Sequence, residues 1–341
     1  MRKFFITGGA GFIGSAFIHL ILSETSGITI TNFDLLTYAG NLDNLSGLDP
    51  SRHRFIKGDI CDPKAVLAAI PDGADAVINF AAESHVDRSI ASASEFISTN
   101  VLGTQVLLDA ARAKSVKRFC QISTDEVMGS LREDSDELFT EETVLAPNSP
   151  YAASKAAAEH LVRAAHRTFG MDTVITRCGN NYGPRQFPEK LIPLMIANAL
   201  HDEPLPVYGD GKNVRDWIYV DDHCRAVWKV LEEGRSGETY NIGARNERRN
   251  LEVVESILDA LDKPHSLIKY VTDRPGHDRR YAIDSTKMES ELGWLPQETW
   301  KSGLEKTVSW YLENQEWVSR IRSGDYLNYY REQYGHELDA R

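Results

Sequence analysis

The stretch TGGAGFIG at residues 7–14 places three glycines, Gly8, Gly11 and Gly14, directly between a short apolar run and a helical pattern. Glycines at this spacing permit a tight turn, close approach of the backbone to a pyrophosphate, and close packing of the following helix. The N-terminus of that helix adds free N–H groups and a favourable dipole for an anion. The stretch therefore predicts a strand, a turn and a helix that together bind a dinucleotide.

Apolar runs and helical patterns alternate through the first half of the chain. We expect strands at 3–7, 27–34, 53–59, 74–82, 116–123 and 172–178, and helices at 12–24 and 150–169. Continuous apolar strands joined by helical crossovers indicate a parallel sheet covered on both faces. The fold class is therefore α/β, a doubly wound parallel sheet. Later helices, near 188–200, 221–232, 251–261 and 302–313, predict a smaller, mostly C-terminal lobe over the strand ends.

Charge and cysteine usage narrow the range of partners. The chain carries 38 Lys and Arg against 50 Asp and Glu, a net charge of −12, which argues against nucleic acid or an anionic membrane as a partner. The sequence contains no run of about 18 apolar residues, so we expect no membrane span. The four cysteines are far apart without CxxC spacing. We therefore expect no metal site, no disulfide framework and a reducing, cytoplasmic location.

Asp34 ends the second predicted strand, 20 residues after Gly14. A carboxylate at this position accepts hydrogen bonds from both hydroxyls of an adenosine ribose and repels a 2′-phosphate. The pattern therefore favours NAD over NADP. The segments GDI at 58–60 and FAAES at 80–84 close the next two strands and are expected to line the adenine and nicotinamide sides.

Tyr151 and Lys155 lie four residues apart on the alanine-rich helix, so they project from one face one turn apart. Ser149 is the expected N-cap of this helix, and Gly170 follows its end. A lysine ammonium beside a tyrosine, helped by a positively charged nicotinamide, lowers the pKa of the tyrosine toward working pH. The tyrosine can then take a proton from a sugar hydroxyl while hydride leaves the same carbon.

These motifs resemble the extended short-chain dehydrogenase/reductase superfamily, whose members act on nucleotide sugars. Within it, seven blocks are similar to the dTDP-glucose 4,6-dehydratase family, and the resemblance runs from residue 1 to about 314. The blocks are LLTYAGN at 35–41, AAESHVDRSI at 81–90, STDEV at 123–127, NNYGP at 180–184, FPEKLIPLMI at 187–196, VRDWIYVDDH at 214–223 and DRPGHDRRYAID at 273–284. The chain departs from the family pattern at Met128, where tyrosine is usual, and at Gly179, where serine is more typical.

The resemblance implies a catalytic role for the acidic pair in STDEV. Oxidation of C4 of the hexose makes the C5 hydrogen acidic, and loss of the C6 hydroxyl then needs a base and an acid. Glu126 is implied as the base at C5, Asp125 as the acid at O6, and Thr124 as the group that holds the C4 oxygen. Successive residues of a regular strand face opposite sides, so the backbone must leave the extended form near Thr124 for Asp125 and Glu126 to reach one sugar.

The resemblance also implies the cofactor and substrate contacts, the assembly and the domains. Cofactor contacts are expected from Gly8, Gly11, Phe12, Ile13, Gly14, Asp34, Leu35, Leu36, Thr37, Asp59, Ile60, Phe80, Ala81, Ala82, Ser84, Thr99, Tyr151, Lys155 and Asn181. Substrate contacts are expected from Ser84, Thr124, Asn180, Lys190, Leu191, Pro206, Tyr208, Arg215, Asn250, Arg274 and His277. We expect an NAD-binding domain at 1–184, to which about 214–250 returns, a nucleotide-sugar-binding lobe at 185–330 and a tail at 331–341. A homodimer through helices near 95–113 and 150–168 is expected.

Four other functions compete with the conversion of dTDP-glucose to its 4-keto-6-deoxy product, a step of deoxysugar biosynthesis such as that of rhamnose. A C4 epimerase or C6 decarboxylase uses the same NAD site and Tyr/Lys pair, but neither needs adjacent acids to expel a hydroxyl. A cofactor-sensing binding protein would have no use for the acids, the tyrosine and the lysine together. A UDP-glucose 4,6-dehydratase needs nearly the same residues, because thymine differs from uracil by one methyl group, worth about 1–3 kcal/mol.

Overall fold

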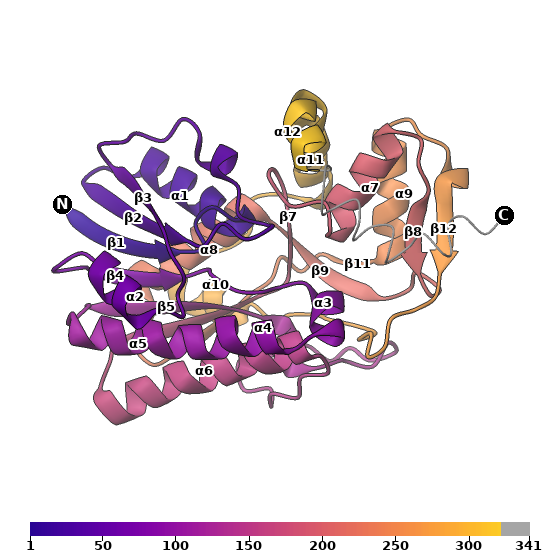
Figure 1. The fold of residues 1–341 in the computed structure, drawn as a ribbon. Coiled ribbons are helices and arrows are strands. Elements are labelled where there is room, and N and C mark those ends of the chain that lie inside the picture. The colour runs from indigo at the N-terminus through magenta and orange to yellow at the C-terminus, as the bar shows by residue number, and fades with distance from the viewer. Residues whose placement is uncertain (322–341) are drawn as a thin grey trace.

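The computed structural model describes residues 1–321, so the predicted tail at 331–341 and the end of the predicted smaller lobe lie outside the described residues. Seven strands form a parallel sheet in the order β10, β6, β5, β4, β1, β2, β3 (Figure 1). The strands are β1 Arg2–Thr7, β2 Ile28–Asp34, β3 His53–Lys57, β4 Ala76–Asn79, β5 Arg118–Thr124, β6 Thr173–Cys178 and β10 Thr239–Ile242. The sheet confirms the predicted doubly wound fold.

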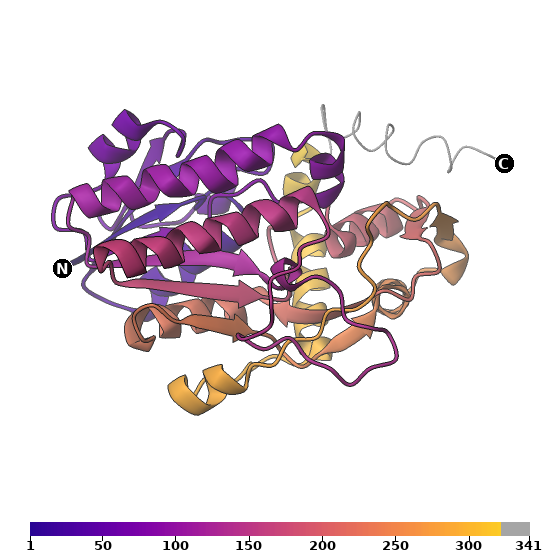
Figure 2. The same cartoon turned by 90° about the horizontal axis from the view of Figure 1, so that it is seen from below.

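Helices cover both faces of this sheet, and each face has its own apolar core. One face is covered by α1 Phe12–Glu24 and α8 Val220–Glu233, with α10 Thr286–Leu292 beside them. The other face is covered by α2 Pro63–Ala69, α5 Gly103–Ala113 and α6 Pro150–Phe169. Figure 2 shows α5 and α6 side by side across that face. Burial on both faces explains why the strands read as continuous apolar runs.

The smaller lobe lies beyond the carboxyl ends of the main strands (Figure 1). It holds a three-stranded sheet of β7 Asn180–Tyr182, β9 Val214–Tyr219 and β11 Glu247–Arg249, and a pair of β8 Leu205–Tyr208 and β12 Ile268–Val271. Its helices are α7 Leu191–Leu200, α9 Asn250–Ala260, α11 Trp300–Glu313 and α12 Gln315–Ile321. A separate apolar core, rich in aromatic side chains, holds these elements together.

Several short helical elements lie between these longer helices and strands. They are η1 Leu42–Leu45, α3 Val86–Ala91, α4 Ser94–Phe96, the π-helical turn η2 Ile97–Leu102, η3 Asp125–Met128 and η4 His265–Leu267. The helix expected near 95–113 corresponds to α4, η2 and α5 together, whereas the sequence analysis did not predict α2, α3, α10 or α12. The later strand β10 joins the main sheet, whereas β9 and β11 pair in the smaller one. The division of the chain at residue 184 stays a prediction.

The structure confirms the predicted boundaries of α6. Ser149 is the N-cap, and its hydroxyl accepts a hydrogen bond from the backbone N–H of Ala152 at 3.1 Å. Gly170 ends the helix in the left-handed conformation, at φ 66°. Within the described residues, no helix is long and apolar enough to cross a membrane.

Candidate active site

A cavity lies at the carboxyl ends of the main strands and extends toward the smaller lobe. Its floor is the glycine turn between β1 and α1. A Cβ atom at Gly8 would lie 2.5 Å from the backbone nitrogen of Ala81, and one at Gly14 would overlap the Gly8 carbonyl oxygen. The turn is therefore a cradle that only glycine leaves open. Such a cradle at the start of a helix fits the pyrophosphate of a dinucleotide.

Asp34 lies at the end of β2 and faces the same cavity. Its Oδ2 accepts a hydrogen bond from the backbone N–H of Ala10 at 2.9 Å, and its Oδ1 accepts one from that of Leu36 at 2.8 Å. Burial raises the pKa of Asp34, and these two backbone donors oppose the rise. The carboxylate is held in place with lone pairs left for ribose hydroxyls.

The expected cofactor residues gather around this cavity with one difference. All of them line it except Leu36, which stands in the left-handed conformation at φ 58°. The backbone N–H of Leu36 instead donates a hydrogen bond to Asp34. The glycine turn and the Asp34 carboxylate that line the cavity are the groups that an NAD molecule needs for its pyrophosphate and its ribose.

The acidic pair is placed by an abrupt change of backbone conformation. Strand β5 ends at Thr124, and the 3₁₀-helical turn η3 begins at Asp125. Thr124 is the N-cap of this turn, since its hydroxyl accepts a hydrogen bond from the backbone N–H of Glu126 at 3.3 Å. Asp125 and Glu126 therefore both line the cavity rather than facing opposite sides of a strand. This confirms that the chain leaves the extended form at Thr124.

The two carboxyl groups have different surroundings. Burial raises the pKa of Asp125 well above its usual value, and the Glu126 carboxylate raises it further. Burial also raises the pKa of Glu126, but Arg274, Lys190 and Arg215 oppose that rise. One oxygen of Asp125, Oδ2, is buried and has no hydrogen-bond partner in the described chain. This division suits a protonated Asp125 beside an ionised Glu126.

Tyr151 and Lys155 project from the first two turns of α6 into the cavity. The Lys155 ammonium donates a hydrogen bond to the Ile122 carbonyl oxygen at 2.6 Å, and burial lowers its pKa to about 8. Burial and the Glu126 carboxylate raise the pKa of Tyr151, and the Thr124 hydroxyl opposes them. The predicted lowering of the Tyr151 pKa by Lys155 is not found among the protein's own groups. In the protein alone, burial and the neighbouring carboxyl groups hold the Tyr151 pKa above its usual value.

The expected substrate residues fall into two groups. Ser84, Thr124, Asn180 and Lys190 line the cavity, and the Lys190 ammonium donates to the Ser84 carbonyl oxygen at 2.7 Å. The others do not line it and belong to the smaller lobe: Leu191 in α7, Pro206 and Tyr208 in β8, Arg215 in β9, Asn250 in α9, and Arg274 and His277 in the 272–285 segment.

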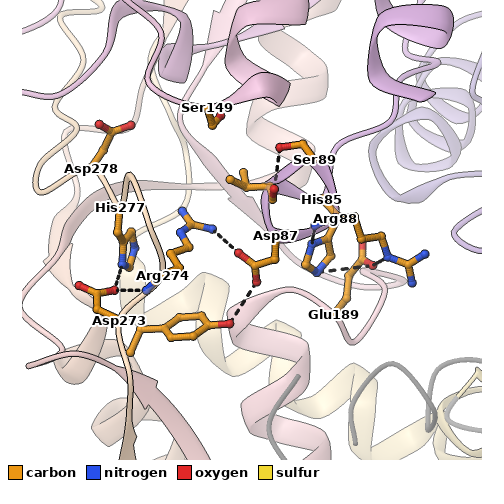
Figure 3. Close-up of polar contacts among 12 residues, drawn as sticks. His85, Asp87, Arg88, Ser89, Ser149, Glu189, Asp273, Arg274, His277 and Asp278 are labelled. Carbon is orange, nitrogen blue, oxygen red and sulfur yellow. Dashed lines mark hydrogen bonds and ion pairs between the residues drawn. The ribbon is translucent and has the colours of Figure 1, made fainter. Parts of the chain in front are cut away.

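Asp87 in α3 binds two of these smaller-lobe residues, Arg274 and Tyr208, and His277 packs beside Tyr208 (Figure 3). The Oδ1 of Asp87 accepts a hydrogen bond from Arg274 at 3.1 Å, and its Oδ2 accepts one from the Tyr208 hydroxyl at 3.1 Å. The His277 ring packs edge-on against Tyr208 with 6.0 Å between ring centres, and its Nδ1 lies 2.5 Å from Asp273. The Arg274 Nε is buried without a partner in the described chain, which leaves a donor for an anionic ligand.

Arg215 and Asn250 complete the polar wall of the smaller lobe. The Arg215 guanidinium lies 4.1 Å from the centre of the Tyr281 ring and donates to the Asp278 carbonyl oxygen at 2.9 Å. The Asn250 Oδ1 is buried and has no partner among the described residues. Together with Lys190 and Arg274, Arg215 forms a positive cluster that reaches the Glu126 carboxylate electrostatically. Such a cluster in an acidic protein suits a diphosphate.

Sequence reasoning missed Asp87, Phe187 and Glu189 as site residues. Phe187 and Glu189 line the cavity, and Asp87 holds Arg274 and Tyr208. All three lie inside the blocks HVDRSI and FPEKL that carry the resemblance. Their position in those blocks could have indicated that they belong to the site. Their partners lie more than 100 residues away in the chain, so no local spacing pairs them.

The two departures from the family pattern are both structurally accommodated. Met128 is buried with Val127, Phe139 and Tyr281, and its sulfur lies 3.7 Å from the Arg177 guanidinium. It does not line the cavity. At Gly179, a Cβ atom would lie 2.6 Å from the backbone oxygen of Asp216. A serine at this position would require a shift of β9.

Comparison with known proteins gives consistent matches over nearly the whole chain. The family model for GDP-mannose 4,6 dehydratase matches residues 5–307. The dTDP-glucose 4,6-dehydratase of Xanthomonas campestris is 54% identical, over 96% of this chain and 97% of that protein. The Salmonella typhimurium dTDP-glucose 4,6-dehydratase is 51% identical, over 97% and 99%. The solved structure of DesIV, the Streptomyces venezuelae dTDP-glucose 4,6-dehydratase with NAD bound, has a TM-score of 0.90 at 49% identity, covering 94% of this chain and all of that one.

Proposed function

The chain belongs to the GDP-mannose 4,6 dehydratase family, and on that premise we propose that it converts dTDP-glucose to dTDP-4-keto-6-deoxy-glucose and water. Its relatives at about half identity carry that activity in their names and cover nearly its full length. NAD is its cofactor, as in the DesIV structure. The observation that carries the proposal is the acid pair, which η3 turns into the cavity beside Tyr151 and Lys155.

The first step is removal of hydrogen from C4 of the glucose. NAD, when bound, takes hydride from C4 and later returns it to C6. Tyr151 accepts the proton of the C4 hydroxyl, and the Thr124 hydroxyl holds the resulting oxygen. Lys155, fixed by the Ile122 carbonyl oxygen, supplies positive charge behind the tyrosine.

The second step is loss of water across C5 and C6. Glu126, whose ionised form is favoured by Arg274, Lys190 and Arg215, accepts the C5 proton. Asp125, whose pKa burial raises, gives its proton to O6, and water leaves. Glu126 returns its proton to C5 when hydride reaches C6. The proton that Tyr151 holds restores the acid form of Asp125 for the next cycle. The sum is loss of one water with no net oxidation.

The nucleotide is held by the smaller lobe. We assign the positive side chains of Lys190, Arg215 and Arg274 to the diphosphate, and Asn250 and Leu191 are further expected contacts of the nucleotide. The uridine sugar is the second candidate substrate, because the two bases differ by one methyl group, but the relatives support the thymidine sugar. A C4 epimerase shares the cavity but has no use for the acid pair.

The proposal extends to the setting in which the enzyme works. We infer a homodimer formed through α5 and α6, whose helices lie side by side with Ile97 and Leu102 exposed at the adjoining turn. Four free cysteines suit a reducing cytoplasm. We further infer an NAD-binding domain at 1–184 and a nucleotide-sugar-binding lobe from residue 185 onward.

The test is turnover of dTDP-glucose in deuterium oxide by the wild-type chain and by Glu126→Gln. We expect wild type to give the 4-keto-6-deoxy product with deuterium at C5 and no net NADH. We expect the variant to lose at least about a hundredfold in rate, because general base catalysis contributes on the order of 10²–10⁴. UDP-glucose is the control substrate. Wild-type protein that binds NAD but makes no product from dTDP-glucose would sink the proposal.

A further inference from the structure

We propose that Tyr38 retains the cofactor: its hydrogen bond to Glu189 closes the NAD cavity between two segments that must part before NAD can leave. The inference rests on the proposed function, because it takes the cavity to be an NAD site. It adds a residue that the predicted cofactor set did not contain. It also gives a structural reason why NAD stays bound while it is reduced and reoxidised in every cycle.

Two segments, far apart in the chain, border the cavity and meet at Tyr38. One is the 35–40 loop that follows Asp34, and the other is the 186–190 segment that leads into α7. The Tyr38 hydroxyl donates a hydrogen bond to Glu189 Oε1 at 3.1 Å, across 151 residues of chain. The Tyr38 ring also packs edge-on against Phe187, with 5.6 Å between ring centres. These contacts join the sheet-bearing lobe to the smaller lobe across the cavity.

The partner of Tyr38 is itself held by a third segment, the start of α3 (Figure 3). His85 Nε2 lies 3.7 Å and Arg88 Nε 3.8 Å from Glu189 Oε2. The Glu189 side chain is only 2% exposed. The Arg88 guanidinium also lies 3.9 Å from the centre of the Tyr38 ring, at cation–π distance. Arg88 therefore supports both members of the Tyr38–Glu189 pair.

The charge state of the pair favours this hydrogen bond. Burial raises the pKa of Tyr38, and the Glu189 carboxylate adds to the rise, so the hydroxyl stays protonated and acts as a donor. Burial raises the pKa of the Glu189 carboxyl to about 7, and Lys190, Arg88 and the Tyr38 hydroxyl oppose the rise, so the acceptor is charged and the hydrogen bond strongest above pH 7. Removing only the donor therefore leaves the ring in place and opens the junction.

The experiment compares Tyr38→Phe with Tyr270→Phe, a tyrosine that is 59% exposed on β12 and far from the cavity. Each protein is passed through a desalting column, its bound NAD is counted, and exchange with labelled NAD is timed in the absence of sugar. We expect Tyr38→Phe to release NAD about tenfold faster or more, and to need added NAD for turnover. At saturating NAD its kcat should match wild type.

A second variant, Arg88→Met, keeps an apolar side chain over the Tyr38 ring but removes the charge. We expect it to release NAD faster than wild type and to fold as wild type does, because Arg88 is only half-buried. Tyr38→Phe protein that holds NAD as firmly as wild type would overturn the inference alone. Wild-type protein that binds no NAD would overturn the proposed function, and the inference with it.

Discussion

Asp125 is a carboxyl group kept from water, with one oxygen that has no partner in the described chain and a second carboxylate beside it. A buried group in this state lowers the stability of the fold whenever it ionises. Its surroundings suit an acid that must hold a proton near neutral pH. The same surroundings predict a conflict between stability and activity at this residue.

Asp125→Asn should be more stable than wild type above pH 7, although it should lose activity. In the unfolded chain an aspartate titrates near pH 4. Because the folded-state pKa of Asp125 is higher, its contribution to stability is fully present below about pH 4 and is lost as pH rises through the folded-state pKa. Asparagine cannot ionise. We therefore expect the melting temperature of the variant to exceed that of wild type by about 2 °C or more at pH 8.

The difference in melting temperature should shrink as pH falls toward 4, and calorimetry across this range measures it. Asp134→Asn is the matched control, because that carboxylate is exposed and lies outside α5 and α6. It should shift stability by the same small amount at every pH. A variant at Asp125 that melts below wild type at pH 8 would contradict the assignment of a strained, buried acid.

At the scale of the element, the helix α6 both positions reacting side chains and contributes to the stability of the fold. Its first turns carry Tyr151 and Lys155, and its last turn lies at the other end of the sheet face. Ser149 and Gly170 terminate it by local hydrogen bonding and by backbone conformation, respectively. The two ends therefore contribute similar stability but only one of them positions reacting groups.

Ser149→Ala and Gly170→Ala should separate these two contributions. Loss of the cap that Ser149 provides costs about 1 kcal/mol, and alanine in the left-handed conformation of Gly170 costs about as much. We expect both variants to lose similar stability in urea unfolding. Only Ser149→Ala should lower kcat, because its loosened first turn holds Tyr151. Equal kcat for both variants would show that the cap has no part in placing the tyrosine.

At the scale of the whole molecule, the cavity needs both lobes, and the exposed apolar residues beside α5 suggest a second copy of the chain. Ile97 is 56% exposed and Leu102 is 52% exposed. Both lie in the turn η2 that leads into α5. Exposed apolar residues next to two adjacent helices suit an interface formed by four helices, two from each protomer.

Light scattering should therefore give a mass of about twice the 38.2 kDa of the chain. Leu102→Glu should shift the protein toward the monomer, since it buries a charge at the interface. Leu295→Glu is the matched control, because Leu295 is 53% exposed but lies after α10. A monomeric wild type would dismiss the homodimer.

Local patterns determined the sheet, the helix α6 and the core of the site. The glycine turn, Asp34, the STDEV block and the Tyr151/Lys155 spacing each depend on residues close in the chain, so sequence alone predicts them. The change of direction at Thr124 was also predictable, because alternation in a strand forbids both acids from facing one cavity.

Packing between distant segments decided what surrounds that core. Arg274, Lys190 and Arg215 oppose the rise in the Glu126 pKa although they lie at least 64 positions further along the chain. Asp87 meets Arg274 across 187 residues, and Tyr38 meets Glu189 across 151. No spacing in the sequence encodes these meetings. They arise only when the smaller lobe folds over the strand ends, because burial and charge depend on neighbours in space.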